Sequence, residues 1–405
     1  MKKLKFLTMA ALAVLCFSAC QEEEPATRQI TDPVAPILKD VEMPVEANAY
    51  PGTNVRILGV GFSEGDVVTC TSLDGEPAFT PEVVNVDNNS ITIAVPETSC
   101  GRYQVTVTRE GLTSPLPGEL SIPYIVVLRK VEVPTNVLKP GETLTITAKD
   151  DFVAGDKVRF ESTSYPKGVA LEAEGTVSGN TLTVKVPADA YSVNSLTLVR
   201  GKMIGEIGQV RIGLDKFTVG AGGIVFYTSD EGVHGLVAYP KATMGTNGDF
   251  EGQSYGPSIP NTYSIGVNYA VYSGKTNSAA LYANEQKARD AGFAFDAKTA
   301  CGLAEELTYE QNGITYDDYF LPSLDELVQL WNVLNEVNAT GAWQPNGWIP
   351  AGNYWSSTEY DSSGGWVWAM CYCNFYENPA NGGNVVTGVA DRVGWKISAI
   401  AVRQF

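Results

Sequence analysis

The sequence predicts a multidomain protein in which two all-β sandwiches are followed by one α+β domain. Three observations predict this fold class. Glycine (40 residues) and proline (22) are frequent and charged residues make up only 18% of the chain, which favours turn-rich β structure. Two consecutive stretches follow the same strand plan over roughly ninety residues each, a sandwich length. Helical periodicity and all seven Trp residues are confined to the C-terminal stretch.

Residues 1–19 are typical of a secretory signal peptide, because the basic start "MKKLK" precedes the short apolar run "FLTMAALAVLCF". The run ends in "FSAC", which resembles the lipobox of bacterial lipoproteins and implies lipidation of Cys20. Residues 20–34 then resemble the acidic tether of surface-exported lipoproteins in some Gram-negative bacteria. We therefore expect a surface-exposed protein, anchored by lipid in the outer membrane. An ordinary secretory signal and a plain solvated linker are the alternatives.

The formal net charge of −18 disfavours nucleic-acid binding, because an acidic chain repels phosphate backbones. No two cysteines have zinc-finger spacing, so we predict no metal site. Cys70 lies in a predicted strand and Cys100 just before another strand of the same stretch. In an oxidising exterior the two are expected to form a disulfide. Cys371 and Cys373 are expected to be buried thiols, and the state of Cys301 is left open.

Residues 35–124, the first module, read as short strands bounded by turn residues: "TNVRILGVGF", "VVTCTS", "SITIAVP" and "GRYQVTVTRE". Their order resembles the IPT/TIG family of immunoglobulin-like domains. The matching residues are Gly59, Gly61, Phe62, Pro96, Gly101 and Tyr103. The resemblance implies an Ig-like sandwich.

Residues 125–214, the second module, repeat this plan. "PTNVLKPGETLTITAKDDFVAGDKVRF" parallels "PVEANAYPGTNVRILGVGFSEGDVV", and "NTLTVKVPADAYSVNSLTLVRG" parallels "NSITIAVPETSCGRYQVTVTRE". Neither module contains Trp or His, so we interpret both as Ig-like spacers.

Residues 215–405, the third module, open with two strands joined by a turn in "VGAGGIVFYTSDEGVHGLVAYP". Short helices are predicted in "NSAALYANEQKARDAG" and "DAKTACGLAEEL". The clearest helix is "LPSLDELVQLWNVLNEV", where Ser323 and Glu326 form a capping box. Its apolar stripe consists of Leu324, Leu327, Trp331, Leu334 and Val337.

Seven motifs of this module occur in the order of a known family: "GGIVFY", "HGLVA", "AKTAC", "DDYFLPSLDEL", "YWSSTEY", "GGWVWA" and the terminal "AVR". They resemble the C-terminal domain of Legionella collagen-like adhesins and the related Fibrobacter-type paralogous surface domains. That family has a C-type-lectin-like fold, and the resemblance implies adhesion or ligand binding. Two stretches depart from it. The family commonly has Asp-Trp before Leu-Pro, whereas "DDYFLP" has Tyr319 and Phe320 there, and "CYCNFYENPANGG" matches no motif of the family.

The aromatic stretch after residue 353 supplies the candidate binding residues. On a strand, Trp355 points away from Tyr354 and Ser356, which predicts one core face. Further on, Cys371, Cys373 and Phe375 alternate with Tyr and Asn, which are suited to recognition. The candidate ligand-binding residues are Trp366, Tyr372, Asn374, Tyr376, Asn378 and Asn381. The alternative is that the stretch forms only the aromatic core of a small domain.

No catalytic residue is predicted, because the one histidine, His234, fits a turn position. No cofactor is required, although the oxygens of Glu359, Asp361, Glu377 and Asn378 could contribute to a calcium site. We therefore predict a cell-surface lipoprotein adhesin that binds a glycan or a protein through its third module. A formylglycine-generating or carbohydrate-active enzyme and a structural subunit of a surface assembly are the alternatives.

Overall fold

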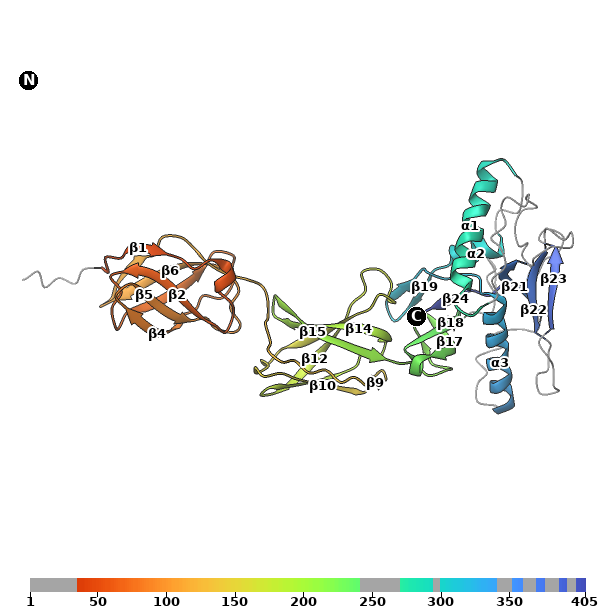
Figure 1. Cartoon of the computed structure of the whole chain (residues 1–405), viewed down its shortest axis with the longest axis horizontal. Helices are drawn as coiled ribbons and strands as arrows, with labels where there is room; N and C mark the ends of the chain where they lie inside the picture. Colours follow the sequence, from red (N-terminus) through yellow and green to blue (C-terminus); the bar gives the residue numbers. More distant parts are fainter. Residues whose placement is uncertain are drawn as a thin grey trace, which may run out of the picture.

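The computed structural model describes residues 35–240, 270–293, 299–340, 352–359, 369–375, 386–391 and 398–405. This part of the chain is mostly β-sheet with few helices. The sheets form three groups that follow the chain order and lie in a row, from β1 at one end to β23 at the other (Figure 1). These groups fall within the three modules, whose boundaries stay predictions.

The first module pairs two antiparallel sheets around one core. Its elements are β1 (Lys39–Glu42), η1 (Glu46–Asn48), β2 (Asn54–Val60), β3 (Val67–Ser72), β4 (Glu82–Asp87), β5 (Ser90–Ala94), β6 (Gly101–Arg109), β7 (Leu112–Pro115) and β8 (Leu120–Ile122). One sheet has the order β1-β2-β5-β4, and the other is β3-β6-β7 with β8 also on β6. Buried and exposed residues alternate along β2, as the sequence predicts. The core includes Val55, Ile57, Val105 and Val107.

The second module is built from one continuous path of strands. They are β9 (Val137–Leu138), β10 (Thr143–Thr147), β11 (Lys157–Glu161), β12 (Leu171–Ser178), β13 (Thr181–Lys185), β14 (Ser192–Arg200) and β15 (Met203–Ile212). Their order is β10-β13-β12-β11-β14-β15-β9. All neighbours are antiparallel except β9, which pairs parallel to β15. The core includes Leu144, Phe160, Leu182 and Leu196.

The third module combines small sheets with helices. Its elements are β16 (Val219–Gly220), β17 (Gly223–Ser229), η2 (Asp230–Gly232), β18 (His234–Ala238), α1 (Gly274–Asp290), α2 (Ala300–Glu305), β19 (Tyr309–Gln311), β20 (Ile314–Tyr316), α3 (Leu324–Thr340), β21 (Gly352–Glu359), β22 (Ala369–Phe375), β23 (Val386–Asp391) and β24 (Val402–Gln404). The sheets are β16-β17-β18-β24, β19-β20 and β21-β22-β23. The three predicted helices are confirmed as α1, α2 and α3.

Strand β21 is buried on both faces, which differs from the single core face that the sequence predicts. Trp355 packs in a core with residues of β17, β18 and α2, while Tyr354 packs in a second core with residues of α3. The polar residues that follow, from Ser356 to Glu359, are buried as well. The reason is the position of the strand, because β21 contacts both α1 and α3.

Candidate functional site

Two of the six predicted binding residues lie on β22, the central strand of the β21-β22-β23 sheet. In the register, Tyr372 is opposite Trp355 of β21 and Gly388 of β23. Asn374 is opposite Asn353 and Val386. Trp366, Tyr376, Asn378 and Asn381 lie outside the described residues, as does Cys20. The binding role of this face therefore stays a prediction.

The disulfide expected between Cys70 and Cys100 is not formed, because both are buried free thiols. Each belongs to a different core: Cys70 packs inside the first module, whereas Cys100 packs with Val126 and Met203 of the second. Burial raises the pKa of the Cys70 thiol to about 12. Burial, and then the nearby Glu76 carboxylate, also raise the pKa of Cys100. Neither thiol is suited to act as a nucleophile.

Cys301 on α2 is a third buried free thiol. Its Sγ donates to the Ser278 carbonyl oxygen of α1 at 3.2 Å, so it ties two helices together. Burial raises its pKa well above the usual value, with a further contribution from Glu285. We therefore assign this cysteine to the core.

The predicted capping box is confirmed, and its Glu326 carboxylate also accepts hydrogen bonds from the beginning of α1. The Ser323 N–H donates to the Glu326 carboxylate at 2.8 Å, and the Glu326 N–H donates to Ser323 Oγ at 3.3 Å. The same carboxylate accepts the N–H of Tyr272 at 2.8 Å and that of Gly274 at 3.3 Å. Glu326 therefore joins the beginnings of α1 and α3. A Cβ on Gly274 would lie 2.1 Å from this carboxylate, so only glycine fits there.

Arg403 of β24 joins the third module to the second. It is 1% exposed, pairs with Asp318, and donates to the carbonyl oxygens of Ala221 (3.0 Å) and Ser164. Its guanidinium also lies over the rings of Tyr191 and Tyr316, at 5.6 and 4.9 Å from their centroids. Ser164 and Tyr191 belong to the second module, so the two modules share one core here.

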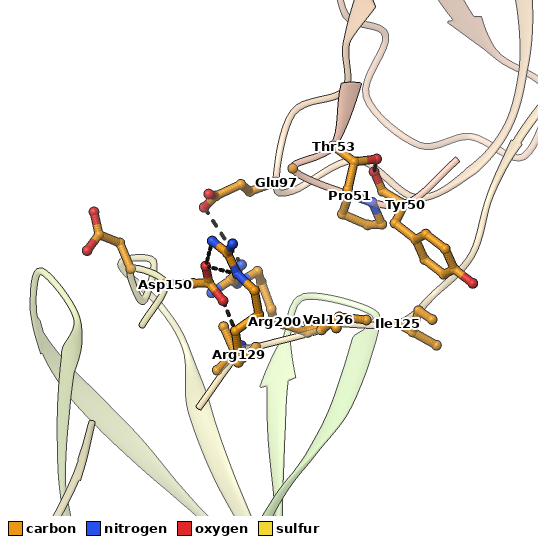
Figure 2. Close-up of a pocket in the computed structure, with 13 residues that line it drawn as sticks. Tyr50, Pro51, Thr53, Glu97, Ile125, Val126, Arg129, Asp150 and Arg200 are labelled. Carbon is orange, nitrogen blue, oxygen red and sulfur yellow. Dashed lines mark hydrogen bonds and ion pairs between the residues drawn. The ribbon is translucent and has the colours of Figure 1, made fainter. Parts of the chain in front are cut away.

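A cleft of about 610 Å³ lies between the first and second modules (Figure 2). One wall comes from residues 50–53 and Glu97 of the first module. The other comes from residues 125–129, Asp150, Asp151 and Arg200 of the second. Figure 2 shows Arg200 reaching toward Glu97 at one end, while Tyr50 and Ile125 lie at the other. The cleft thus has a charged end and an apolar end.

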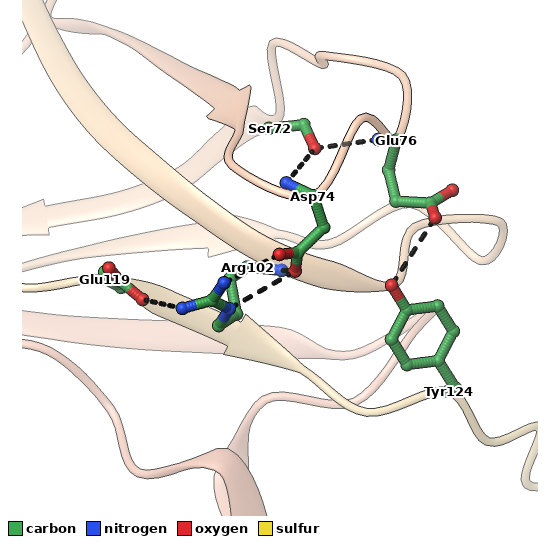
Figure 3. Close-up of polar contacts among 6 residues, drawn as sticks. All are labelled: Ser72, Asp74, Glu76, Arg102, Glu119 and Tyr124. Atoms are coloured by element: carbon green, nitrogen blue, oxygen red, sulfur yellow. Dashed lines mark hydrogen bonds and ion pairs between the residues drawn. The ribbon is translucent and has the colours of Figure 1, made fainter.

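A polar cluster lies on the first module (Figure 3). Arg102 pairs with Asp74 at 2.8 Å and with Glu119 at 3.4 Å. The Ser72 hydroxyl oxygen accepts the N–H groups of Asp74 and Glu76, which fixes the loop between them. Glu76 then pairs with Lys202, at the tip of the β14–β15 hairpin of the second module. The cluster thereby helps to hold the joint between the two modules.

One pair of contacts, which sequence reasoning missed, repeats in the first and second modules. In the first, Arg109 donates to both oxygens of buried Asp66, at 2.7 and 2.8 Å. In the second, Arg200 donates to both oxygens of buried Asp156, at 2.8 Å each. Each Asp also accepts a backbone N–H three residues earlier, at 2.9 Å. The signal was present in the sequence, because "GD" and the Arg recur at matching places of the repeat.

His234 begins β18, and its side chain is exposed. Within the described ranges, no three His, Cys, Asp or Glu side chains group closely enough to hold a metal ion. None of the helices in the described part of the chain is long and apolar enough to cross a membrane.

No protein-family model matches the sequence, and no curated protein matches it. Among solved structures, the SGBP-B protein of a mixed-linkage glucan utilization locus of Bacteroides ovatus, in complex with a mixed-linkage heptasaccharide, is 16% identical. That alignment covers 45% of this chain and 43% of the other, with a TM-score of 0.17. A surface glycan-binding protein from Prevotella bryantii is 14% identical over 58% of each chain, with a TM-score of 0.26.

A segment of two fibronectin type-III domains from chicken tenascin is 14% identical over 43% of this chain and 98% of its own, with a TM-score of 0.26. The structural neighbours thus include surface glycan-binding proteins and fibronectin domains. The alignments span less than two thirds of either glycan-binding chain.

Proposed function

We propose that the chain is a surface lipoprotein that binds a glycan or protein ligand through its third module. In this proposal Cys20 carries the lipid, the two Ig-like modules are spacers, and the third module is a C-type-lectin-like head. The candidate binding residues of the head are those on and around β22.

The observation that carries the proposal is the order of the modules in space (Figure 1). The first described strand, β1, lies at one end of the row, and β22 and β23 lie at the other. The first described strand after the segment that would hold the lipid, β1, and the strand that carries Tyr372 and Asn374 therefore lie far apart. A spacer of this kind presents a binding face away from a membrane.

The shared core between the second and third modules supports the same proposal. Phe405 at the end of the chain packs edge-to-face on Tyr191, with ring centroids 5.6 Å apart. Together with Arg403, this contact fixes the head on its neighbouring spacer. A head held in this way presents its binding face in a defined orientation.

A binding screen of the mature chain without lipid tests the proposal. Glycans and matrix proteins are immobilised and probed with and without calcium. For any ligand found that binds outside the cleft between the first two modules, the double variant Tyr372→Ala and Tyr376→Ala should bind roughly 10- to 100-fold more weakly with a nearly unchanged Tm. The matched control is Tyr124→Ala, which replaces an exposed tyrosine of the first module. This control should bind normally.

Two results would refute the proposal. The first is the absence of binding to every glycan and protein probed. The second is a large fall in Tm of the double variant with binding per folded molecule retained, since these tyrosines would then belong to the core.

A further inference from the structure

The cleft between the first and second modules is the second feature of the molecule that could bind a ligand. Its volume of about 610 Å³ lies within the usual range of small-molecule sites. The cleft is formed by the two spacer modules, so the proposed function of the third module does not account for it.

At the charged end, a donor and an acceptor face each other across a gap (Figure 2). Arg200 Nη1 lies 3.9 Å from Glu97 Oε2, which is too long for a direct hydrogen bond. Arg200 cannot easily move closer, because its Nε and Nη2 are held by buried Asp156. A hydroxyl group beside this gap, within hydrogen-bond distance of both atoms, can accept from Arg200 and donate to Glu97 at once.

Arg109, the equivalent arginine of the first module, differs from Arg200 in its hydrogen-bond partners. Arg109 makes the same pair of bonds to its aspartate, but its Nη2 also donates to the carbonyl oxygen of Gly61 at 2.8 Å. The bonds of Arg109 thus lie inside its own module. Arg200 instead directs its Nη1 toward the carboxylate of the other module.

A second ion pair, between Arg129 and Asp150, lines the same end. Asp150 accepts the Arg129 backbone N–H at 2.6 Å and Nε at 2.8 Å, and the side-chain bond to Arg129 is the main cause that lowers its pKa. Both cleft arginines are therefore already paired with carboxylates. Asp151 and Glu97 add further negative charge. An anionic ligand is disfavoured, whereas a neutral ligand that is rich in hydroxyl groups fits.

The apolar end offers exposed hydrophobic surface. Ile125 is 37% exposed and Val127 is 65% exposed, although both are large aliphatic residues. Tyr50 and Pro51 lie on the opposite wall. A tyrosine ring beside aliphatic side chains can pack against the C–H face of a sugar ring. The hydroxyl groups of the same sugar can then form hydrogen bonds at the charged end of the cleft.

We infer that this cleft binds a neutral carbohydrate, with its hydroxyl groups between Arg200 and Glu97 and a sugar face against Tyr50. Because the two walls come from different modules, the bound sugar bridges the joint. This site is distinct from the proposed site on the third module.

The test is titration calorimetry of the mature chain with neutral tetrasaccharides of glucose, mannose and galactose, and with a sulfated tetrasaccharide. We expect at least one neutral sugar to bind and the sulfated one not to bind. Glu97→Ala and Tyr50→Ala should each weaken that binding about 10-fold. Glu64→Ala, an exposed carboxylate of the first module outside the cleft, is the matched control and should bind normally.

The head variants separate this inference from the proposed function. Tyr372→Ala with Tyr376→Ala should leave binding in the cleft unchanged. The inference is overturned if no neutral sugar binds, if the sulfated sugar binds more tightly, or if Glu97→Ala and Tyr50→Ala bind like the unaltered chain.

Discussion

Replacing Arg403 by Met should loosen the joint between the second and third modules. Methionine keeps much of the volume of the side chain but removes every charged contact. Those contacts are the ion pair with Asp318, the bonds to the carbonyl oxygens of Ala221 and Ser164, and the position over the rings of Tyr191 and Tyr316. The variant therefore tests whether this one side chain holds the head in place.

The size of the effect follows from burial. Removing one partner of a buried pair costs about 3–5 kcal/mol, because the groups left behind are desolvated and unpaired. The Asp318 side chain is 34% exposed, so water can solvate part of it and the lower end of that range applies. We expect a loss of about 3 kcal/mol, or a fall in Tm of roughly 6–12 °C for the unit formed by both modules.

Differential scanning calorimetry of the mature chain measures this loss. Arg211→Met is the matched control, because Arg211 pairs with Asp230 at the surface of the same pair of modules. That control should cost less than about 1 kcal/mol. Limited proteolysis should also cut Arg403→Met between the second and third modules more rapidly than it cuts the control.

A variant Arg403→Met that unfolds within about 1 kcal/mol of the unaltered chain would refute this reasoning. The two modules would then be joined by apolar packing alone, and Arg403 would contribute little to the joint.

Three further predictions follow from single residues. Burial raises the pKa of Glu326 to about 7, while backbone N–H bonds from Ser323, Gly274 and Tyr272 pull it down. Its folded pKa is thus above the value of 4.5 for a free side chain, so the contribution of Glu326 to stability should be greatest below about pH 4.5 and fall by about 3 kcal/mol as the pH rises through 7. Unfolding of Glu326→Gln should lack this part of the pH dependence. Cys20→Ala should release the protein from the membrane fraction, and continued membrane association would contradict a lipid anchor. Alkylation of the unreduced, unfolded chain should label both Cys70 and Cys100, whereas a pair resistant to label would show the disulfide.

The sequence predicted best the features that depend on neighbours along the chain. Strand alternation located β2, and the capping box located the beginning of α3. Both patterns repeat within a few residues and need no knowledge of the fold. The bonds from Glu326 to the N–H groups of Tyr272 and Gly274 connect positions more than fifty residues apart, and no local pattern could reveal them.

The misjudged features depend on packing between elements. The face of β21 opposite Trp355 looked exposed in the sequence, but Tyr354 on that face packs in a core with residues of α3. Cys70 and Cys100 looked like partners because both belong to the first module. They are apart because Cys100 points into the core shared with the second module. The cleft was missed because its two walls come from different modules, so no stretch within one module shows it.

Hydrogen–deuterium exchange of the full mature chain, with and without a ligand from the binding screen, tests the central claim most directly. The account predicts that the ligand protects backbone amides of β22 and its neighbouring strands β21 and β23. Amides of the first-module strand β2 should exchange unchanged. Protection confined to the two spacer modules, with none in the third module, would contradict the claim that the head is the binding module.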